Sequence, residues 1–393
     1  MWVEPIMQNN FVVLACLALA IAAPPVSFAS DNSATPNPAS SPSIPSWTDL
    51  LAAWGISANG YIAASYYDSN GYPSNIHEFD VQHDTFQLDE AGFSVAYQPK
   101  QGFGGLVDVI AGEDARILHI AEDGNDDAFD IRQAFVQYAY GPLTVIAGKY
   151  VTLAGAEVIN PTQNTNFSRS LLFTESEPLD HTGVRATYAI GDTLSIIAGI
   201  NNGWNVTSTS YGSKTGEAGL AWTPSKSFSL STSAYFGKTE YLPGTSVLVD
   251  ADRTLVDLVA TYNATSALTF IMNIDWDRQD QAFGAGSTNA TWYGAAGYLN
   301  YAFNDRWRVS IRGEYLDDCD GLITAAPNGQ HLWEGTVTVG YAPTPHFELR
   351  VEGRYDSSQK SFFYRMNPDS PAATDGMLTD SLSELALQGI FKF

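Results

Sequence analysis

The feature that most constrains this chain is a strict two-residue alternation of charge. In the stretch FELRVEGRYD, residues 347–356, every odd-numbered residue is uncharged and every even-numbered residue is charged. Alternate side chains of an extended strand point to opposite faces, so the stretch predicts a β-strand with one apolar and one charged face. A half-buried strand of a soluble sheet shows the same alternation, so its surroundings must be inferred from the number of such strands and from their connections.

The same alternation recurs along most of the chain. It predicts sixteen strands, at residues 56–67, 86–97, 104–111, 129–140, 143–150, 181–190, 193–201, 215–223, 227–237, 253–262, 267–278, 291–303, 306–317, 332–342, 346–356 and 381–393. Short turns follow every even-numbered strand, and longer polar loops follow the odd-numbered ones. This arrangement places all short turns at one end of an up-and-down sheet, as in a transmembrane antiparallel β-barrel.

The uncharged faces carry aromatic residues toward both strand ends, which predicts two girdles at the depth of the lipid headgroups. The turn-end residues are Tyr97, Tyr140, Trp222, Phe228, Tyr262, Tyr301, Trp307, Tyr341 and Phe347, and the loop-end residues are Trp276, Tyr293, Tyr315, Trp333 and Tyr355. Shifting strand 346–356 by one residue would expose two arginines and three acids to lipid, at a cost on the order of 10 kcal/mol. A soluble two-sheet sandwich is the alternative fold, and it fits sixteen long strands poorly.

The two ends of the chain indicate export. The apolar run FVVLACLALAIAA and the small-residue site at Ala29 predict a signal peptide over residues 1–29. Residues 30–54 are predicted to be a flexible Pro/Ser-rich segment, and residues 55–393 to be the barrel. The closing strand ends at Phe393, a signal of the kind read by the barrel-assembly machinery of a Gram-negative outer membrane.

The composition limits the kinds of molecule that the chain can be expected to bind. The chain has 19 basic and 43 acidic residues, which argues against nucleic acid as a partner. Cys319 is the single cysteine beyond the predicted signal, so no internal disulfide is expected. The expected partners are outer-membrane lipid, lipopolysaccharide and small polar solutes. A sixteen-stranded barrel is too wide to be filled by its wall side chains, so it would enclose a water channel.

Other kinds of chemistry are weakly represented. The run EDGNDDAFD at residues 122–130 has Ala128 where a calcium loop needs glycine, and it lacks the closing glutamate, so neither a metal site nor a cofactor is predicted. His181 and Ser168 are the one pairing that suggests catalysis, and no enzyme is predicted. A barrel acting as a surface adhesin or structural anchor is the alternative function.

The run AGKYVTLAGAEVINPTQNTNFSRSLLFTESEPLDHTGVRATY, residues 147–188, resembles the OmpL-like β-barrel porins. The matching residues are Gly148, Lys149, Gly155, Ala156, Glu157, Asn166, Ser168, Arg169, Ser170, Thr182, Gly183 and Arg185. This chain has Leu179 where the family often has phenylalanine after proline. The resemblance implies an outer-membrane porin for passive diffusion of small hydrophilic solutes and ions. Porins of sixteen strands commonly form trimers, so a homotrimer is expected.

The third long loop, residues 151–180, is rich in aromatic and aliphatic residues, so it is expected to fold into the lumen as a constriction, as the third loop of general porins does. A flexible outer loop is the alternative. Rings of opposed charge set the selectivity of such pores. The predicted pore-lining and constriction residues are Arg132, Lys149, Glu157, Arg169, Glu175, Glu177, Asp180, Arg185, Arg308, Arg312, Arg350 and Arg354. Salt bridges with strand acids such as Glu314, Glu348 or Glu352 are the alternative role for each arginine.

Overall fold

A computed structural model describes residues 51, 53–71, 76–123, 126–208, 212, 214–241, 248–284, 286–365 and 378–393. The predicted signal peptide, 1–29, lies outside the described residues, as does nearly all of the predicted lead-in at 30–54. These two assignments therefore stay predictions.

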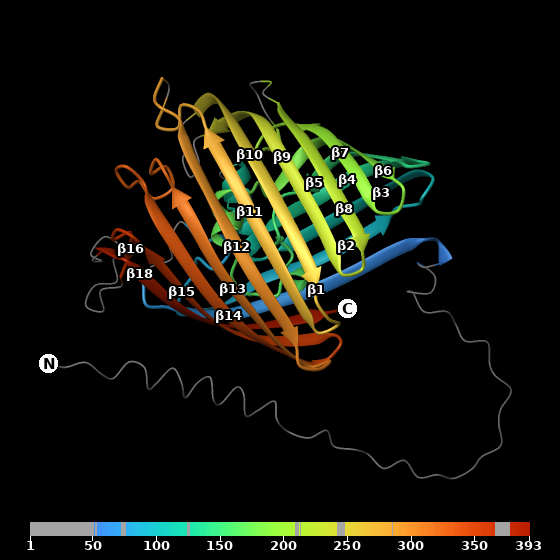
Figure 1. The fold of residues 1–393 in the computed structure, drawn as a ribbon. Coiled ribbons are helices and arrows are strands. Elements are labelled where there is room, and N and C mark those ends of the chain that lie inside the picture. Colours follow the sequence, from blue (N-terminus) through green and yellow to red (C-terminus); the bar gives the residue numbers. More distant parts are fainter. Residues whose placement is uncertain are drawn as a thin grey trace, which may run out of the picture. The chain divides into compact units, whose positions relative to one another are not determined.

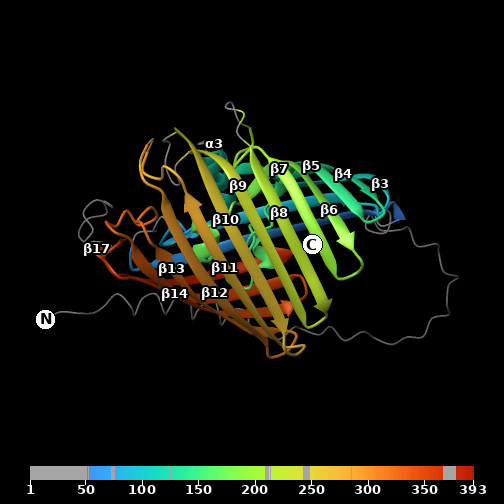
Figure 2. The same ribbon diagram turned by 45° about the horizontal axis from the view of Figure 1, so that its top comes forward.

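Sixteen antiparallel strands form one closed barrel, in which each strand pairs with its neighbours in sequence and β18 pairs with β1. Figures 1 and 2 show a single wall of inclined strands, with the red last strand beside the blue first strand. The barrel strands are β1 (Ile56–Ser69), β2 (Thr85–Tyr97), β3 (Gly102–Ala111), β4 (Phe129–Tyr140), β5 (Leu143–Val151), β6 (Asp180–Ile190), β7 (Leu194–Asn201), β8 (Thr215–Ser225), β9 (Phe228–Tyr241), β10 (Leu248–Asn263), β11 (Leu268–Gln279), β12 (Ala290–Ala302), β13 (Trp307–Asp318), β14 (Gln330–Thr344), β15 (Phe347–Ser358) and β18 (Ser381–Lys392).

All sixteen predicted strands are confirmed, and most bounds agree within a few residues. The largest difference is at β9 and β10, which extend to Tyr241 and from Leu248 where a long loop was predicted. Three short elements were not predicted. They are α3 (Glu113–Asp123) and the two-residue strands β16 (Phe363–Tyr364) and β17 (Leu378–Thr379), which pair with each other. These elements lie in connections whose polar composition hides short regular structure.

Closure joins the two ends of the barrel sequence. Tyr61 of β1 is opposite Lys392 of β18, and the pairing continues to Ser69 and Glu384. The backbone N–H and C=O of Gly60 both hydrogen-bond to Phe393, at 3.0 and 2.9 Å. Because every strand has two partners, the barrel has no open edge. No helix of the described residues is long and apolar enough to cross a membrane.

The apolar and charged faces are sorted as the alternation predicts. On β15, Tyr355 is 53% exposed whereas Arg350 and Arg354 are 2% and 3% exposed. In a closed barrel the exposed face is the outer one, so the charged face points inward. Aromatic residues of both predicted girdles, such as Trp307 and Trp333, are exposed on the outer face. On β13–β15 the charged face is covered by protein, so the predicted water channel does not reach these strands.

The cover comes from three connections. They are residues 76–84 between β1 and β2, α3 between β3 and β4, and the segment 152–179 between β5 and β6, which includes η1 (Pro161–Gln163) and α4 (Leu171–Glu175). Leu171 and Leu172 pack with Trp292 and Leu316 of the wall, whereas Phe173 packs with Phe79 and with Leu118 of α3. These apolar contacts join the three connections to one another and to the inward face of the strands.

Candidate pore and constriction

The segment 152–179 is held in shape by its own polar side chains. Arg169 donates hydrogen bonds to the carbonyl oxygens of Val158, Phe167 and Ile159 at 3.0, 2.7 and 2.7 Å. Ser170 caps α4, and its hydroxyl oxygen accepts a hydrogen bond from the N–H of Phe173 at 3.0 Å. Hydrogen bonds within the segment therefore hold this part of its backbone in shape without help from the barrel wall.

Two wall glutamates bind backbone N–H groups of this segment. The carboxylate of Glu352 on β15 accepts from the N–H groups of Phe167 and Ser168 at 2.6 and 2.8 Å. The carboxylate of Glu314 on β13 accepts from Leu171 N–H at 2.7 Å.

Four wall arginines bind its carbonyl oxygens. Each donates from Nη1 at 2.7 to 3.1 Å, and the donor–acceptor pairs are Arg308 to Thr165, Arg312 to Ser168, Arg350 to Pro161 and Arg354 to Arg169. Irregular backbone away from water must find partners for its N–H and C=O groups. The charged face of β13–β15 supplies those partners.

Apart from Arg169, which binds carbonyl oxygens of its own segment, the basic residues predicted for the pore are in ion pairs with wall acids. Arg132 binds Asp108 at 2.7 Å and Glu90 at 2.8 Å. Lys149 lies 3.3 Å from Asp130 and 3.1 Å from Asp180. The remaining pairs are Arg185 with Glu217, Arg308 with Glu348, Arg312 with Glu314 and Glu334, Arg350 with Glu348, and Arg354 with Asp356.

The predicted acids of the third loop are distributed differently. Glu157 binds Arg312 at 2.8 Å and accepts a hydrogen bond from Ser170 N–H at 2.6 Å. Asp180 pairs with Lys149, whereas Glu175 lies at the end of α4. Glu177 packs against the backbone of Gly155, and its carboxylate leaves no room for a Cβ on that residue. Two of the four predicted loop acids are therefore bound directly to predicted basic residues, instead of facing them across a water path.

A cavity of about 400 Å³ remains between this segment and the opposite wall. Its lining comes from β1–β4, from Val151 at the end of β5, from residues 158–163 and from the end of β18. Among the predicted site residues Arg132 lines it, together with Asp108, Gln133 and Lys392. The cavity thus has both charged and apolar side chains in its lining. Its volume is that of a small-molecule site, which is roughly 300 to 1,000 Å³.

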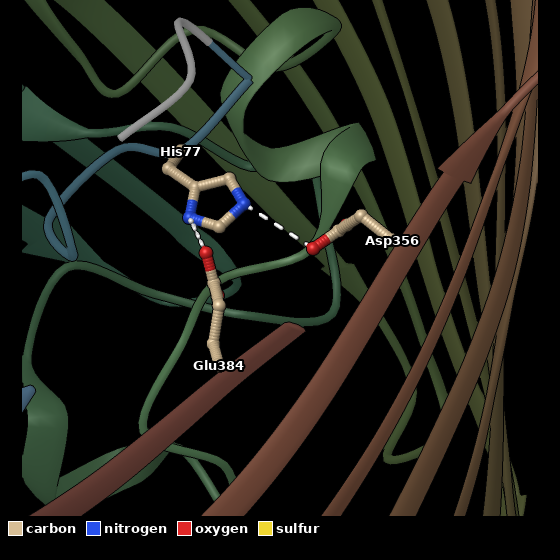
Figure 3. A group of neighbouring side chains, drawn as sticks. All are labelled: His77, Asp356 and Glu384. Carbon is tan, nitrogen blue, oxygen red and sulfur yellow. Dashed lines mark ion pairs between the residues drawn. The ribbon is translucent and has the colours of Figure 1, made fainter. Parts of the chain in front are cut away.

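One charged cluster was not predicted. His77, in the β1–β2 connection, lies 2.8 Å from Asp80, 3.4 Å from Asp356 and 3.4 Å from Glu384. Figure 3 shows the imidazole between the carboxylates of Asp356 and Glu384, which project from β15 and β18. Burial and Arg354 oppose protonation of His77, but the three carboxylates outweigh them and raise its pKa to about 10. Nothing in the local sequence around His77 shows that distant strands supply its partners.

The two residues weighed for catalysis are engaged separately. The ring of His181 stacks on Tyr235 with centroids 4.8 Å apart. The hydroxyl of Ser168 accepts a hydrogen bond from Arg312 at 2.9 Å. No contact between His181 and Ser168 is recorded in the described part of the chain.

Solved structures with similar folds include outer-membrane proteins, among them a channel and a porin. OmpT of Vibrio cholerae in its trimer form is 12% identical, with a TM-score of 0.56 over 86% of this chain and 99% of that one. DcaP of Acinetobacter baumannii is 12% identical, with a TM-score of 0.58 over 86% and 97%. The anion-selective porin from Comamonas acidovorans is 10% identical, with a TM-score of 0.54 over 86% and 99%. Such low identities establish the shared fold alone.

No functionally curated protein matches the sequence significantly. The sequence profile of the family described as beta-barrel porin-2, OmpL-like, matches residues 55–391. This match covers the whole barrel and agrees with the resemblance of residues 147–188. The chain therefore belongs to the OmpL-like beta-barrel porin-2 family.

Proposed function

We propose that this chain forms a channel in the outer membrane of a Gram-negative bacterium, through which small hydrophilic solutes and ions diffuse passively. The observation that carries the proposal is the closed sixteen-strand barrel with an apolar outer face and a charged inner face. An apolar belt suits lipid, and a charged interior suits water and polar solutes.

The segment 152–179 is the proposed constriction. Its hydrogen bonds to Glu314 and Glu352 and to the wall arginines support a position inside the barrel. The cavity beside residues 158–163 is the proposed narrow part of the water path. Arg132 and Asp108 would then meet passing solutes, while the ion-paired arginines of β13–β15 hold the constriction in place.

Conductance across planar bilayers tests the proposal. The purified full-length protein is expected to insert and give stepwise ion currents. A folded, inserted protein that gives no steps would contradict the channel function and would favour the adhesin or anchor alternative.

A variant of the constriction sharpens this test. Arg312→Ala removes the cation that binds Glu157, Glu314 and Glu334, so the segment should loosen and single-channel conductance should rise. Loss of one partner from a buried ion pair costs about 3 to 5 kcal/mol, so the variant should also unfold more easily. Arg306→Ala, at an exposed turn residue, is the matched control and should leave both quantities unchanged.

The barrel is proposed to assemble as a homotrimer. The OmpT fold is known in a trimer form, which supports a homotrimer here. Outer-membrane lipid and lipopolysaccharide would surround the barrel, and the barrel-assembly machinery would bind the strand that ends at Phe393. The proposal includes no catalysis, cofactor or nucleic acid.

A further inference from the structure

A group of buried carboxylates lies where the end of the 152–179 segment meets the wall. Glu177 comes from the segment, Asp257 from β10 and Asp275 from β11. One oxygen of each lies within 4.8 Å of the other two. All three residues are buried, with 4%, 0% and 0% of their surface exposed. A fourth carboxylate, that of Asp277, is close enough to repel the negative charges of both Glu177 and Asp275.

Protein donors satisfy only part of this group. Asn273 donates to Asp257 at 2.9 Å and to Asp275 at 3.2 Å, and Ser233 donates to Asp257 at 3.2 Å. Neither carboxylate oxygen of Glu177 has a hydrogen-bond partner among the described residues, and the same holds for Oδ2 of Asp275. A buried carboxylate without a partner is unstable unless a proton or a cation neutralises it.

Positive charge is scarce at this place. Arg253 is 3.7 Å from Asp277, and its guanidinium stacks over Trp204 at 3.8 Å. The charges that act most strongly on Glu177 belong to Asp257, Glu157, Glu314 and Asp277. Burial and then these acids raise the pKa of Glu177 well above its usual range. The His77 cluster differs, because Arg354 and the imidazole already supply positive charge among its carboxylates.

We propose that Glu177, Asp257 and Asp275 bind a divalent cation of the calcium type, which fastens the end of the constriction segment to β10 and β11. Hard cations of this type prefer oxygen ligands from carboxylates, with metal–oxygen distances of about 2.3 to 2.6 Å. Gly155 permits the geometry, because its φ of +89° and its lack of a Cβ let the backbone lie against the Glu177 carboxylate. The cation would replace the missing protein partners of Glu177.

The test uses the full-length protein, folded in detergent and stripped of metal with EDTA. Terbium is a luminescent substitute for calcium, and Trp292 is near enough to sensitise it, because its indole N–H donates to Ser176, next to Glu177, at 3.2 Å. We expect terbium luminescence when tryptophan is excited. Adding calcium, with no other ion, should displace the terbium and remove this luminescence. Absence of sensitised luminescence in the unmodified protein would overturn the proposal without any variant.

Variants then assign the site. Glu177→Gln and Asp275→Asn should each weaken calcium binding about tenfold or more, which corresponds to about 1.4 kcal/mol per factor of ten. Asp192→Asn, in an exposed turn, removes the same charge elsewhere and should leave binding unchanged. Calcium should also raise the unfolding temperature of the unmodified protein and of Asp192→Asn, but of neither site variant.

Two outcomes would overturn the assignment. Equal calcium affinity in all the proteins would show weak binding to surface acids. The second outcome is an unfolding temperature that does not respond to calcium but depends on pH. If Asp275→Asn loses this pH dependence, Asp257 and Asp275 share a proton. Either result leaves the channel proposal intact, since conductance is measured independently.

Discussion

At the scale of single residues, the barrel interior is held by charges that meet in pairs. Arg185 makes two bonds to Glu217, at 2.6 and 2.7 Å, and Arg354 makes a similar pair with Asp356. Paired guanidinium–carboxylate geometry offsets part of the large cost of removing both charges from water. Removing one partner should therefore lower the stability of the fold more than replacing both partners with apolar residues, because it leaves one buried charge unpaired.

His77 should make stability depend on pH. Its folded-state pKa of about 10 lies above the ordinary value of 6.5. The protonated ring therefore stabilises the fold fully below pH 6.5, and this contribution is lost as the pH rises toward 10. His77→Gln should be less stable than the unmodified protein at pH 6 by about 3 to 5 kcal/mol, with the difference shrinking at alkaline pH.

Urea unfolding of both proteins across this pH range measures the difference. His346→Gln, at an exposed turn residue, is the control and should follow the unmodified protein. A constant gap between His77→Gln and the unmodified protein from pH 6 to pH 10 would show that the imidazole does not change its charge there.

At the scale of elements, the alternation fixes which side of each strand faces lipid. Val337 is in the middle of β14, is 48% exposed, and is opposite Ile311 and Gly353 of the adjacent strands. An arginine on the lipid face costs roughly 2 to 4 kcal/mol at mid-bilayer and about 0 to 1 kcal/mol near the headgroups.

Val337→Arg should therefore fold into lipid vesicles less stably than the unmodified barrel by roughly 2 to 4 kcal/mol. Thr344→Arg, at the turn end of the same strand, carries the same charge at headgroup depth and should cost much less. Folding titrations in urea with vesicles give both values. Similar losses for the two variants would mean that Val337 does not face hydrocarbon.

The strands could be predicted from the sequence, but the contacts inside the barrel could not. A two-residue period is local, so FELRVEGRYD reveals both faces of β15 without knowledge of its neighbours. The partner of each inward charge is not local, since Arg312 meets Glu157 across 155 positions. For the same reason, the alternation could predict a charged inner face, but it could not show that the face holds backbone groups of the segment.

The carboxylate group at Glu177 shows the same limit. Asp257 and Asp275 each fit the alternation as inward residues, so no local signal separates them from the acids that are paired with arginine. Only the folded barrel brings Glu177 against them.

At the scale of the whole molecule, the net charge is −24. An acidic channel concentrates cations near its openings, and salt screens this effect. We expect the reversal potential in a KCl gradient to show preference for potassium at low ionic strength. The preference should weaken near about 1 M salt, where the Debye length is about 3 Å.

The high-salt measurement on the same channel is the control. A chloride preference at low salt would contradict the expectation and would point to local basic residues such as Arg132 and Lys392 as the determinants.

The pairing of β1 with β18 also governs how the molecule can be made. Residue 61 must find residue 392, so the ring cannot close until nearly all of the polypeptide has been delivered to the membrane. Until then, both β1 and the most recently added strand present bare edges that can pair with other chains. A chain cut short before β18 would leave β15 and β1 unmatched, so we expect such a truncation to aggregate instead of closing into a barrel.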